Sequence, residues 1–265
     1  MYKEVVWVTG ASSGIGREMV VQLNRMGYRI IASGRNRQAL ELLASQFSGV
    51  DILDFDVADD ASVPAVQREL LKFTDHIDKV ILNAGNCEYL DFQEPRWEMI
   101  KEITAVNFYG MVNCVEAALP LLKKAQSPQI VGICSQATQA PFPRAEAYGA
   151  SKAAARYFLE SLRMDLKPFN IDVTVILPGF VDTPLTQKND FQMPFLMPAD
   201  QAVKRILTAV FKRKLFYAFP RRLSFLLWLA RHIPKLWLKI NTGKVTLDEE
   251  IVEKPIADGT EETQK

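Results

Sequence analysis

The stretch that decides the fold lies near the start of the chain, where residues 5–16 have the sequence VVWVTGASSGIG. The apolar run predicts a buried strand, and the glycine-rich segment opens an amphipathic stretch, Gly14–Met26, that predicts a helix. Glycines at such a strand-to-helix turn let the backbone approach a pyrophosphate, which the positive end of the helix stabilises. Taken alone, the segment fits an ordinary tight turn as well, so the rest of the chain decides between the two interpretations.

The alternation of apolar strands and amphipathic stretches continues along the chain. Apolar strands separated by helices are typical of a parallel sheet covered on both faces, and they predict a doubly wound, Rossmann-like α/β fold. A chain of 265 residues has room for one such domain. The predicted strands are Glu4–Thr9, Arg29–Gly34, Val50–Asp56, Lys79–Asn83, Gln129–Ser135 and Asp172–Leu177. The predicted helices are Gly14–Met26, Arg37–Gln46, Ala61–Phe73, Trp97–Lys124 and Ala147–Phe169.

Composition excludes several classes of protein. With 48% hydrophobic and 24% charged residues, the chain can bury a core, so disorder over most of its length is excluded. The three cysteines and two histidines lack the spacing of metal ligands, and we expect neither a metal site nor a disulfide framework. Residues 1–8 show no targeting pattern. These features favour a reducing compartment and predict a cytoplasmic protein, with peripheral contact at a membrane left open.

Polar and small residues follow the ends of several predicted strands. Because the carboxyl ends of parallel strands meet at one edge, where open α/β sheets bind ligands, we expect these residues to form one site. Tyr148 and Lys152 stand four positions apart near the start of a predicted helix, so they share one of its faces. The strand-end residues are Asn83, Ala84 and Gly85 after the fourth strand, Ser135 at the fifth, and Pro178, Gly179 and Thr183 after the sixth.

In this set of motifs the chain resembles the short-chain dehydrogenase/reductase family over about residues 3–200. The motifs stand in the family's order and spacing, and the departures, Leu82 and Gln136, remove no catalytic atom. The resemblance implies a dinucleotide-binding catalytic domain at 1–200, in which the proline-containing segment 181–198 predicts an irregular, partly apolar lid. It also implies a catalytic group made of Asn107, Ser135, Tyr148 and Lys152.

The chemistry of that group follows from its side chains. A free tyrosine has a pKa of about 10, and a nearby cation such as Lys152 lowers it. Tyr148 is therefore expected to donate a proton during reduction and accept one during oxidation, while the Ser135 hydroxyl polarises a carbonyl oxygen. The resemblance further implies that Lys152 holds the nicotinamide ribose and that Asn107 orders a water in the proton path. Each residue alone would more often be structural, and their joint placement favours catalysis.

The end of the second predicted strand bears on the choice of cofactor. Gly34 occupies the position where an acidic residue would accept hydrogen bonds from a ribose 2′-hydroxyl, and Arg35 follows it. A guanidinium pairs well with a 2′-phosphate, so we predict NADP(H), although Arg35 alone also fits a plain surface charge. The resemblance assigns the adenine contact to Asp56 and Val57. The predicted cofactor-binding residues are Gly10, Ser12, Ser13, Gly14, Ile15, Gly16, Arg35, Asp56, Val57, Asn83, Ala84, Gly85, Tyr148, Lys152, Pro178, Gly179 and Thr183.

Charge is distributed unevenly along the chain. Residues 201–247 hold 11 lysines and arginines and no acid, whereas residues 248–265 are acidic and predict a flexible tail. We expect 201–247 to form a basic amphipathic extension packed on the catalytic domain. Within it, residues 219–241 predict two short helices rich in leucine and tryptophan, which fit an anionic membrane surface, a cover over the substrate cleft or a subunit contact. Nucleic-acid binding is not expected, because the block is unusually apolar.

The function predicted is an NADP(H)-dependent oxidoreductase, a carbonyl reductase or alcohol dehydrogenase, that interconverts carbonyl and alcohol on a small apolar substrate. The alternative is a non-catalytic protein on the same fold that binds NADPH or docks on a membrane. The complete set of Ser135, Tyr148 and Lys152 favours the enzyme, because a pure binder has no need of it. The apolar helices Trp97–Lys124 and Ala147–Phe169 predict a homodimer or homotetramer.

Overall fold

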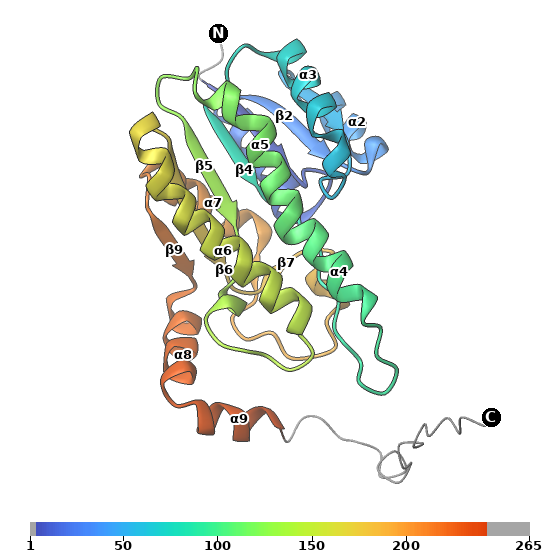
Figure 1. Cartoon of the computed structure of the whole chain (residues 1–265), viewed down its shortest axis with the longest axis vertical. Coiled ribbons are helices and arrows are strands. Elements are labelled where there is room, and N and C mark those ends of the chain that lie inside the picture. The colour runs from blue at the N-terminus through green and yellow to red at the C-terminus, as the bar shows by residue number, and fades with distance from the viewer. Residues whose placement is uncertain (1–3, 243–265) are drawn as a thin grey trace, which may run out of the picture.

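The structure, a computed structural model that describes residues 4–242, is organised around β1 (Val5–Thr9), which is buried along its whole length. β1 pairs in parallel with β2 (Arg29–Gly34) on one side and with β4 (Lys79–Leu82) on the other. The remaining strands of the sheet are β3 (Val50–Asp54), β5 (Gln129–Ile133), β6 (Asp172–Pro178) and β9 (Phe216–Phe219). Seven parallel strands result, in the order β3-β2-β1-β4-β5-β6-β9 (Figure 1), which confirms the predicted doubly wound α/β fold.

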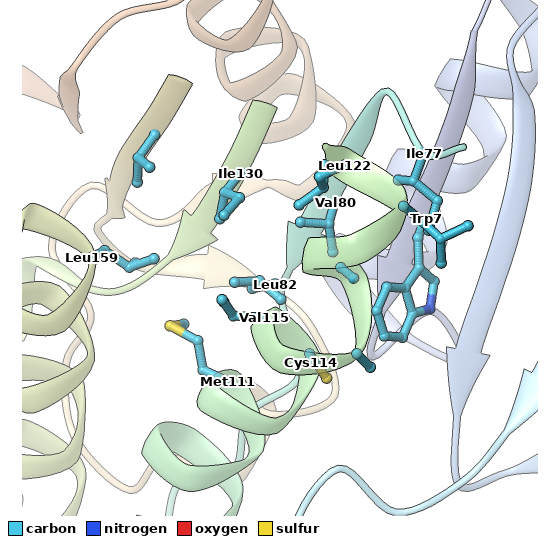
Figure 2. Close-up of a cluster of buried hydrophobic side chains, with 14 of the residues drawn as sticks. Trp7, Ile77, Val80, Leu82, Met111, Cys114, Val115, Leu122, Ile130 and Leu159 are labelled. Atoms are coloured by element: carbon cyan, nitrogen blue, oxygen red, sulfur yellow. The ribbon is translucent and has the colours of Figure 1, made fainter. Parts of the chain in front are cut away.

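Helices cover both faces of this sheet (Figure 1). On one face lie α3 (Val63–Phe73), α5 (Gly110–Leu122) and α6 (Glu146–Leu166), and on the other lie α1 (Gly14–Arg25), α2 (Arg37–Gln46) and α7 (Ala199–Phe211). Figure 2 shows the first of the two cores, in which Trp7 and Val80 of the sheet share a cluster with Cys114 of α5 and Leu159 of α6. The Trp7 indole N–H donates to Ser33 Oγ at 2.7 Å, so this buried donor is satisfied.

The predicted helix Trp97–Lys124 is interrupted in the structure. α4 (Glu98–Thr104) passes through a π-helical turn, Ala105–Tyr109, before α5 begins. Among the described residues, the combined helix is the one segment long and apolar enough to cross a membrane, with a mean hydropathy of 1.3, but 56% of that stretch is buried inside the protein. It is a core helix of the fold, and its π-helical turn carries the fully buried Asn107.

The structure divides the predicted extension 201–247 into two parts. α7 buries Val203 and Ile206 in the second core, and β9 is the last strand of the sheet, so the chain up to Phe219 belongs to the sheet and its cover. After it come α8 (Arg221–His232) and α9 (Pro234–Thr242), which lie beyond the carboxyl end of the strands (Figure 1). Residues 243–247 and the predicted tail 248–265 lie outside the described residues.

The segment predicted as a lid, 181–198, has little regular structure. It begins with β7 (Val181–Asp182) and ends with β8 (Met197–Pro198), and these short strands pair in parallel with each other. A single turn of 3-10 helix, Thr186–Lys188, lies between them. The segment therefore starts and finishes at one place beside the sheet and forms a loop in between.

Candidate active site

A cavity of about 390 Å³ lies along the carboxyl edge of the sheet. All of the predicted catalytic and cofactor-binding residues line it, except Gly16 and Asn107. Sequence reasoning missed several other lining residues, most of which directly neighbour a predicted one. They are Asn36, Phe55, Val106, Ile133, Cys134, Val181, Pro184, Leu185 and Thr186.

The glycine-rich turn is held in place by close approach to the end of β4. A Cβ on Gly16 would lie 2.1 Å from the Gly10 carbonyl oxygen and 2.5 Å from Asn83 Nδ2, and one on Gly10 would lie 2.8 Å from Ala84 Cα. Asn83 Nδ2 donates to the carbonyl oxygens of Thr9 at 3.1 Å and Gly10 at 3.3 Å. Gly16 allows the turn to pack on Asn83 and is not among the residues that line the cavity, so its predicted cofactor contact stays a prediction.

The start of α1 fits a phosphate group. Ser13 stands at the N-cap in an extended conformation, and its side chain makes no capping hydrogen bond. Gly14 has a φ of +52°, and a Cβ there would lie 3.2 Å from the Thr183 side chain. The first amides of the helix therefore stand beside the cavity without a side-chain acceptor from Ser13, and a helix N-terminus of this kind favours an anion.

The far end of the cavity carries Arg35, which follows β2. Its guanidinium lies 3.6 Å from the Asp56 carboxylate, and 65% of the side chain is exposed. Arg37, the next basic residue, is already paired with Glu41 at 2.7 Å and with Asp54 at 3.0 Å. Of these two arginines, Arg35 lines the cavity and is the more weakly held by carboxylates.

Lys152 lies deep at the opposite end, with 4% of its surface exposed. Its ammonium group donates to the Ile133 carbonyl oxygen at 3.1 Å. A Cβ on Gly85 would lie 3.0 Å from Lys152 Nζ and 3.1 Å from Asn107 Oδ1. A side chain at Gly85 would therefore press on both polar groups, which explains why glycine follows Asn-Ala at this point.

The Asn107 side chain is fully engaged by the protein. Its Oδ1 accepts from the backbone N–H of Asn86 at 2.7 Å, and its Nδ2 donates to the Asn86 carbonyl at 2.9 Å and to Ser151 Oγ at 3.0 Å. The amide ties the loop after β4 to α6 one residue before Lys152. Asn107 therefore lies near Lys152 and behind the cavity wall, and its predicted role in ordering a water stays a prediction.

Tyr148 lines the cavity with Ser135. Burial raises the pKa of Tyr148, and an interaction with the Ser135 side chain opposes the shift. Burial also lowers the pKa of Lys152. The direction for Tyr148 is the reverse of the one expected from Lys152, because loss of water around the phenol is the largest influence on its pKa.

Aromatic side chains extend from this end of the cavity toward the lid. The thiol of Cys87 is close enough to Tyr148 to affect its pKa. The Tyr89 ring meets Phe191 edge-on at 5.4 Å, and Phe191 meets Phe180 at 6.0 Å. The lid is tied here by two contacts, from Tyr89 Oη to Asn189 Oδ1 at 3.1 Å and from Arg144 to Asp190 at 2.7 Å. Phe191 lies within the segment predicted as a lid and Phe180 directly before it, whereas Tyr89 and Arg144 come from loops that sequence reasoning did not identify.

The Pro178–Gly179 end of β6 joins the cavity to the C-terminal helices. The Gly179 N–H donates to the Phe219 carbonyl oxygen at 2.7 Å. A Cβ on Gly179 would lie 2.8 Å from Leu223 Cδ2 of α8. On the other side, Ser224 Oγ donates to Gln136 Oε1 at 3.2 Å, one residue after Ser135. The start of α8 therefore packs directly behind the end of the cavity that Ser135 and Gly179 line.

Comparison with known proteins agrees with this architecture. Residues 4–193 match the short chain dehydrogenase family. An uncharacterized oxidoreductase of Myxococcus xanthus is 34% identical over 232 residues, which are 86% of this chain and 91% of that protein. The dehydrogenase/reductase SDR family member 7B of Mus musculus is 33% identical over 190 residues, which are 69% of this chain and 59% of that protein.

Solved structures share the fold at lower identity. A short chain dehydrogenase/reductase from Burkholderia phymatum in complex with NAD has a TM-score of 0.79 at 20% identity, covering 89% of this chain and 95% of that one. The 3-ketoacyl-(acyl-carrier-protein) reductase of Brucella melitensis complexed with NADH has a TM-score of 0.74 at 22% identity, covering 82% and 96%. From the family match and the oxidoreductase relatives, the chain belongs to the short-chain dehydrogenase/reductase family of oxidoreductases.

Proposed function

We propose that this protein is an NADP(H)-dependent oxidoreductase that interconverts a carbonyl and an alcohol on an apolar substrate. The observation that carries the proposal is the composition of a single cavity, with Ser135, Tyr148 and buried Lys152 at one end and the glycine-rich turn and Arg35 at the other. An extended dinucleotide matches this order of groups. The proposal places the enzyme in the cytoplasm, in keeping with its three free cysteines.

The residues would divide the work along the cavity. The start of α1 would hold the pyrophosphate, Asp56 and Val57 the adenine, and Lys152 the nicotinamide ribose. When bound, the nicotinamide supplies or accepts the hydride. Tyr148 gives its proton to the carbonyl oxygen during reduction, and Ser135 donates a hydrogen bond to the same oxygen.

The preference for NADP(H) rests on Arg35 and Gly34 of this chain. No acidic side chain stands at the end of β2, where it would repel a 2′-phosphate, and the Arg35 guanidinium is exposed at the cavity. Two solved relatives were captured with NAD and with NADH, and they lie at 20% and 22% identity. The proposal of NADP(H) therefore rests on the positive charge of Arg35 and the lack of an acidic side chain at the end of β2.

The apolar character of the substrate rests on the lid. Tyr89, Phe191 and Phe180 form a row of edge-on ring contacts that starts beside Tyr148. These rings lie outside the lining of the 390 Å³ cavity, and aromatic rings beside a reacting end favour apolar groups there. We therefore expect aldehydes or ketones with a hydrophobic body to be better substrates than polar ones.

Tyr148→Phe tests the enzyme against the alternative, a protein that binds NADPH without turnover. We expect the variant to bind NADPH with unchanged affinity and to lose at least about 100-fold in turnover, because the acid is removed and the ring is kept. Tyr157→Phe is the matched control, since Tyr157 lies on the same helix and is 78% exposed. The measurement is NADPH titration followed by a panel of aldehydes and ketones. Equal turnover in Tyr148→Phe and wild type would reject the catalytic assignment.

We also propose that the protein is a homodimer or homotetramer. α6 and the π-helical turn before α5 leave large apolar side chains in solvent, with Met164 of α6 at 70% and Tyr109 of the turn at 58% exposure. Exposed residues of this size on neighbouring elements fit a contact between subunits. Light scattering at micromolar concentration tests it, and a purely monomeric protein would contradict it.

A further inference from the structure

The two C-terminal helices are apolar on the side that faces solvent. Phe225 and Leu238 are 62% and 63% exposed, and Trp228 is 53% exposed. Large apolar residues gathered on two short helices form a patch of the kind that monomeric proteins rarely leave uncovered. We refer to α8 and α9 with their exposed residues as the α8–α9 surface. Its main apolar members are Phe225, Leu226, Trp228, Leu229, Leu236 and Leu238.

This exposure is not the result of a loosely attached helix. The opposite stripe of α8, Leu223, Leu227 and Ala230, is buried against Ala140 and the partly buried Phe180. Trp237 of α9 donates its indole N–H to the Pro141 carbonyl oxygen at 2.6 Å, and its ring meets Phe142 edge-on at 5.5 Å. One face of these helices therefore packs on the protein, and the apolar residues of the opposite face remain exposed to solvent.

The same surface is strongly cationic. Arg221, Arg222, Arg231, Lys235 and Lys239 are all exposed, and within residues 4–242 none of them takes part in an ion pair. Residues 201–247 contain no aspartate or glutamate, so no acid within the segment compensates them. Apolar residues and unpaired cations thus share one surface. Along α8, the Phe225 ring stacks on Trp228, and the Trp228 ring meets His232 at a tilt.

We propose that the α8–α9 surface docks this protein on a bilayer that contains anionic lipid. Such a bilayer presents negative headgroups to the cations and an apolar interior to the phenylalanine, tryptophan and leucine side chains. A second copy of the chain fits less well, because face-to-face contact brings like charges together. A helix needs about 20 residues to span a bilayer. α8 has 12 residues and α9 has 9, so each helix is too short to span and would lie in the interface.

Docking in this way turns the catalytic edge toward the lipid. α8 lies at the carboxyl end of the strands (Figure 1) and contacts Gln136, next to Ser135. Phe180, which packs on α8, continues the aromatic row that ends beside Tyr148. If the proposed function holds, an apolar substrate dissolved in the bilayer meets the enzyme at the end where it reacts.

Vesicle co-sedimentation of the full chain tests the proposal. We expect binding to vesicles of phosphatidylcholine with phosphatidylglycerol at low salt, much weaker binding at high salt, and little binding to phosphatidylcholine alone. The triple variant Arg231→Glu, Lys235→Glu, Lys239→Glu should reduce partition by at least about 100-fold, because each cation near an anionic surface contributes roughly fivefold. Its matched control is Arg25→Glu, Arg68→Glu, Lys101→Glu, three exposed cations elsewhere, which should bind like wild type.

A second pair of variants tests the apolar part. Trp228→Ser with Leu238→Ser should remove the binding that survives high salt, whereas Leu42→Ser with Leu71→Ser, at similar exposure on α2 and α3, should not. A full chain that ignores anionic vesicles at low salt overturns the proposal. So does an α8–α9 variant that changes subunit number and leaves vesicle binding intact, because the surface is then a contact between copies. Binding is measured without cofactor or substrate, so its failure is separate from a failure of the proposed function.

Discussion

The glycine-rich turn at residues 9–16 and the α8–α9 surface are held in place by different means. At the turn, backbone meets backbone, and a single added carbon on Gly16 would lie 2.1 Å from the Gly10 carbonyl oxygen. At α8–α9, a stripe of side chains packs on one face and the other face stays open. The first region leaves almost no freedom in sequence, whereas the second constrains only hydrophobicity and charge. That difference explains why the first is recognisable as a motif and the second only as a composition.

Among the variants that test this comparison, we expect Gly16→Ala to lower the free energy of unfolding the most. The added methyl meets backbone that cannot move aside, so we expect a loss of about 3 kcal/mol or more in the free energy of unfolding and weaker cofactor binding. Gly149→Ala is the control, because nothing lies within 4 Å of its Cβ position and alanine favours a helix. Urea unfolding measures both. A Gly16→Ala protein as stable as wild type would show that the turn is less constrained than its geometry indicates.

Arg35→Ala should have the next largest effect. We expect it to weaken cofactor binding and to leave the free energy of unfolding unchanged. Removal of a charge-assisted contact to phosphate costs about 1.5–3 kcal/mol, which weakens NADPH binding by roughly 10- to 150-fold, and NADH binding should change little. Arg37→Ala is the matched control, since Glu41 and Asp54 already hold that guanidinium. Fluorescence titration with both cofactors decides it. Equal losses for NADPH and NADH, or a wild type that prefers NADH, would contradict the cofactor assignment.

The smallest effect is expected at the C-terminal helices. Trp237→Phe keeps the ring against Phe142 and removes the hydrogen bond to Pro141, at a cost of about 1 kcal/mol. Because α9 packs on loops and not on the sheet, the loss should appear as faster amide exchange in α9 with unchanged exchange in β1 and β4. Trp228→Phe, which alters an exposed ring, should leave exchange as it is. Slower folding of the whole sheet in Trp237→Phe would show that the two regions are more tightly coupled than described.

The fold and most of the cavity could be predicted because their signals are local. The period and length of the apolar runs identify the strands. A residue that follows a strand lies at the carboxyl edge of the sheet, so the positions of Ser135 and Gly179 could be predicted without knowledge of any contact. The π-helical turn at Ala105–Tyr109 has no comparable signature, and an uninterrupted apolar pattern predicted one plain helix there. Its Asn107 side chain contacts Asn86 in the loop after β4 and Ser151 of α6, residues that are distant in sequence.

The remaining differences arise from contacts between distant parts of the chain. Tyr89 and Arg144 meet the lid from two separate loops, which no periodic pattern identifies. The pKa of Tyr148 depends on how deeply it is buried, and the sequence shows the neighbouring cation but not the loss of water. The inner contacts of α8 with Ala140 and Phe180 likewise bring together residues far apart in sequence, so composition alone left its partner undecided.

Gly179 takes part in two separate contacts of the structure. Within the Pro-Gly motif it forms part of the cavity wall, and its missing side chain also leaves the space in which Leu223 of α8 is seated. A side chain added at Gly179 would therefore alter both the wall of the cavity and the packing of α8. A different C-terminal segment would therefore need a side chain that fits the space Leu223 occupies beside Gly179.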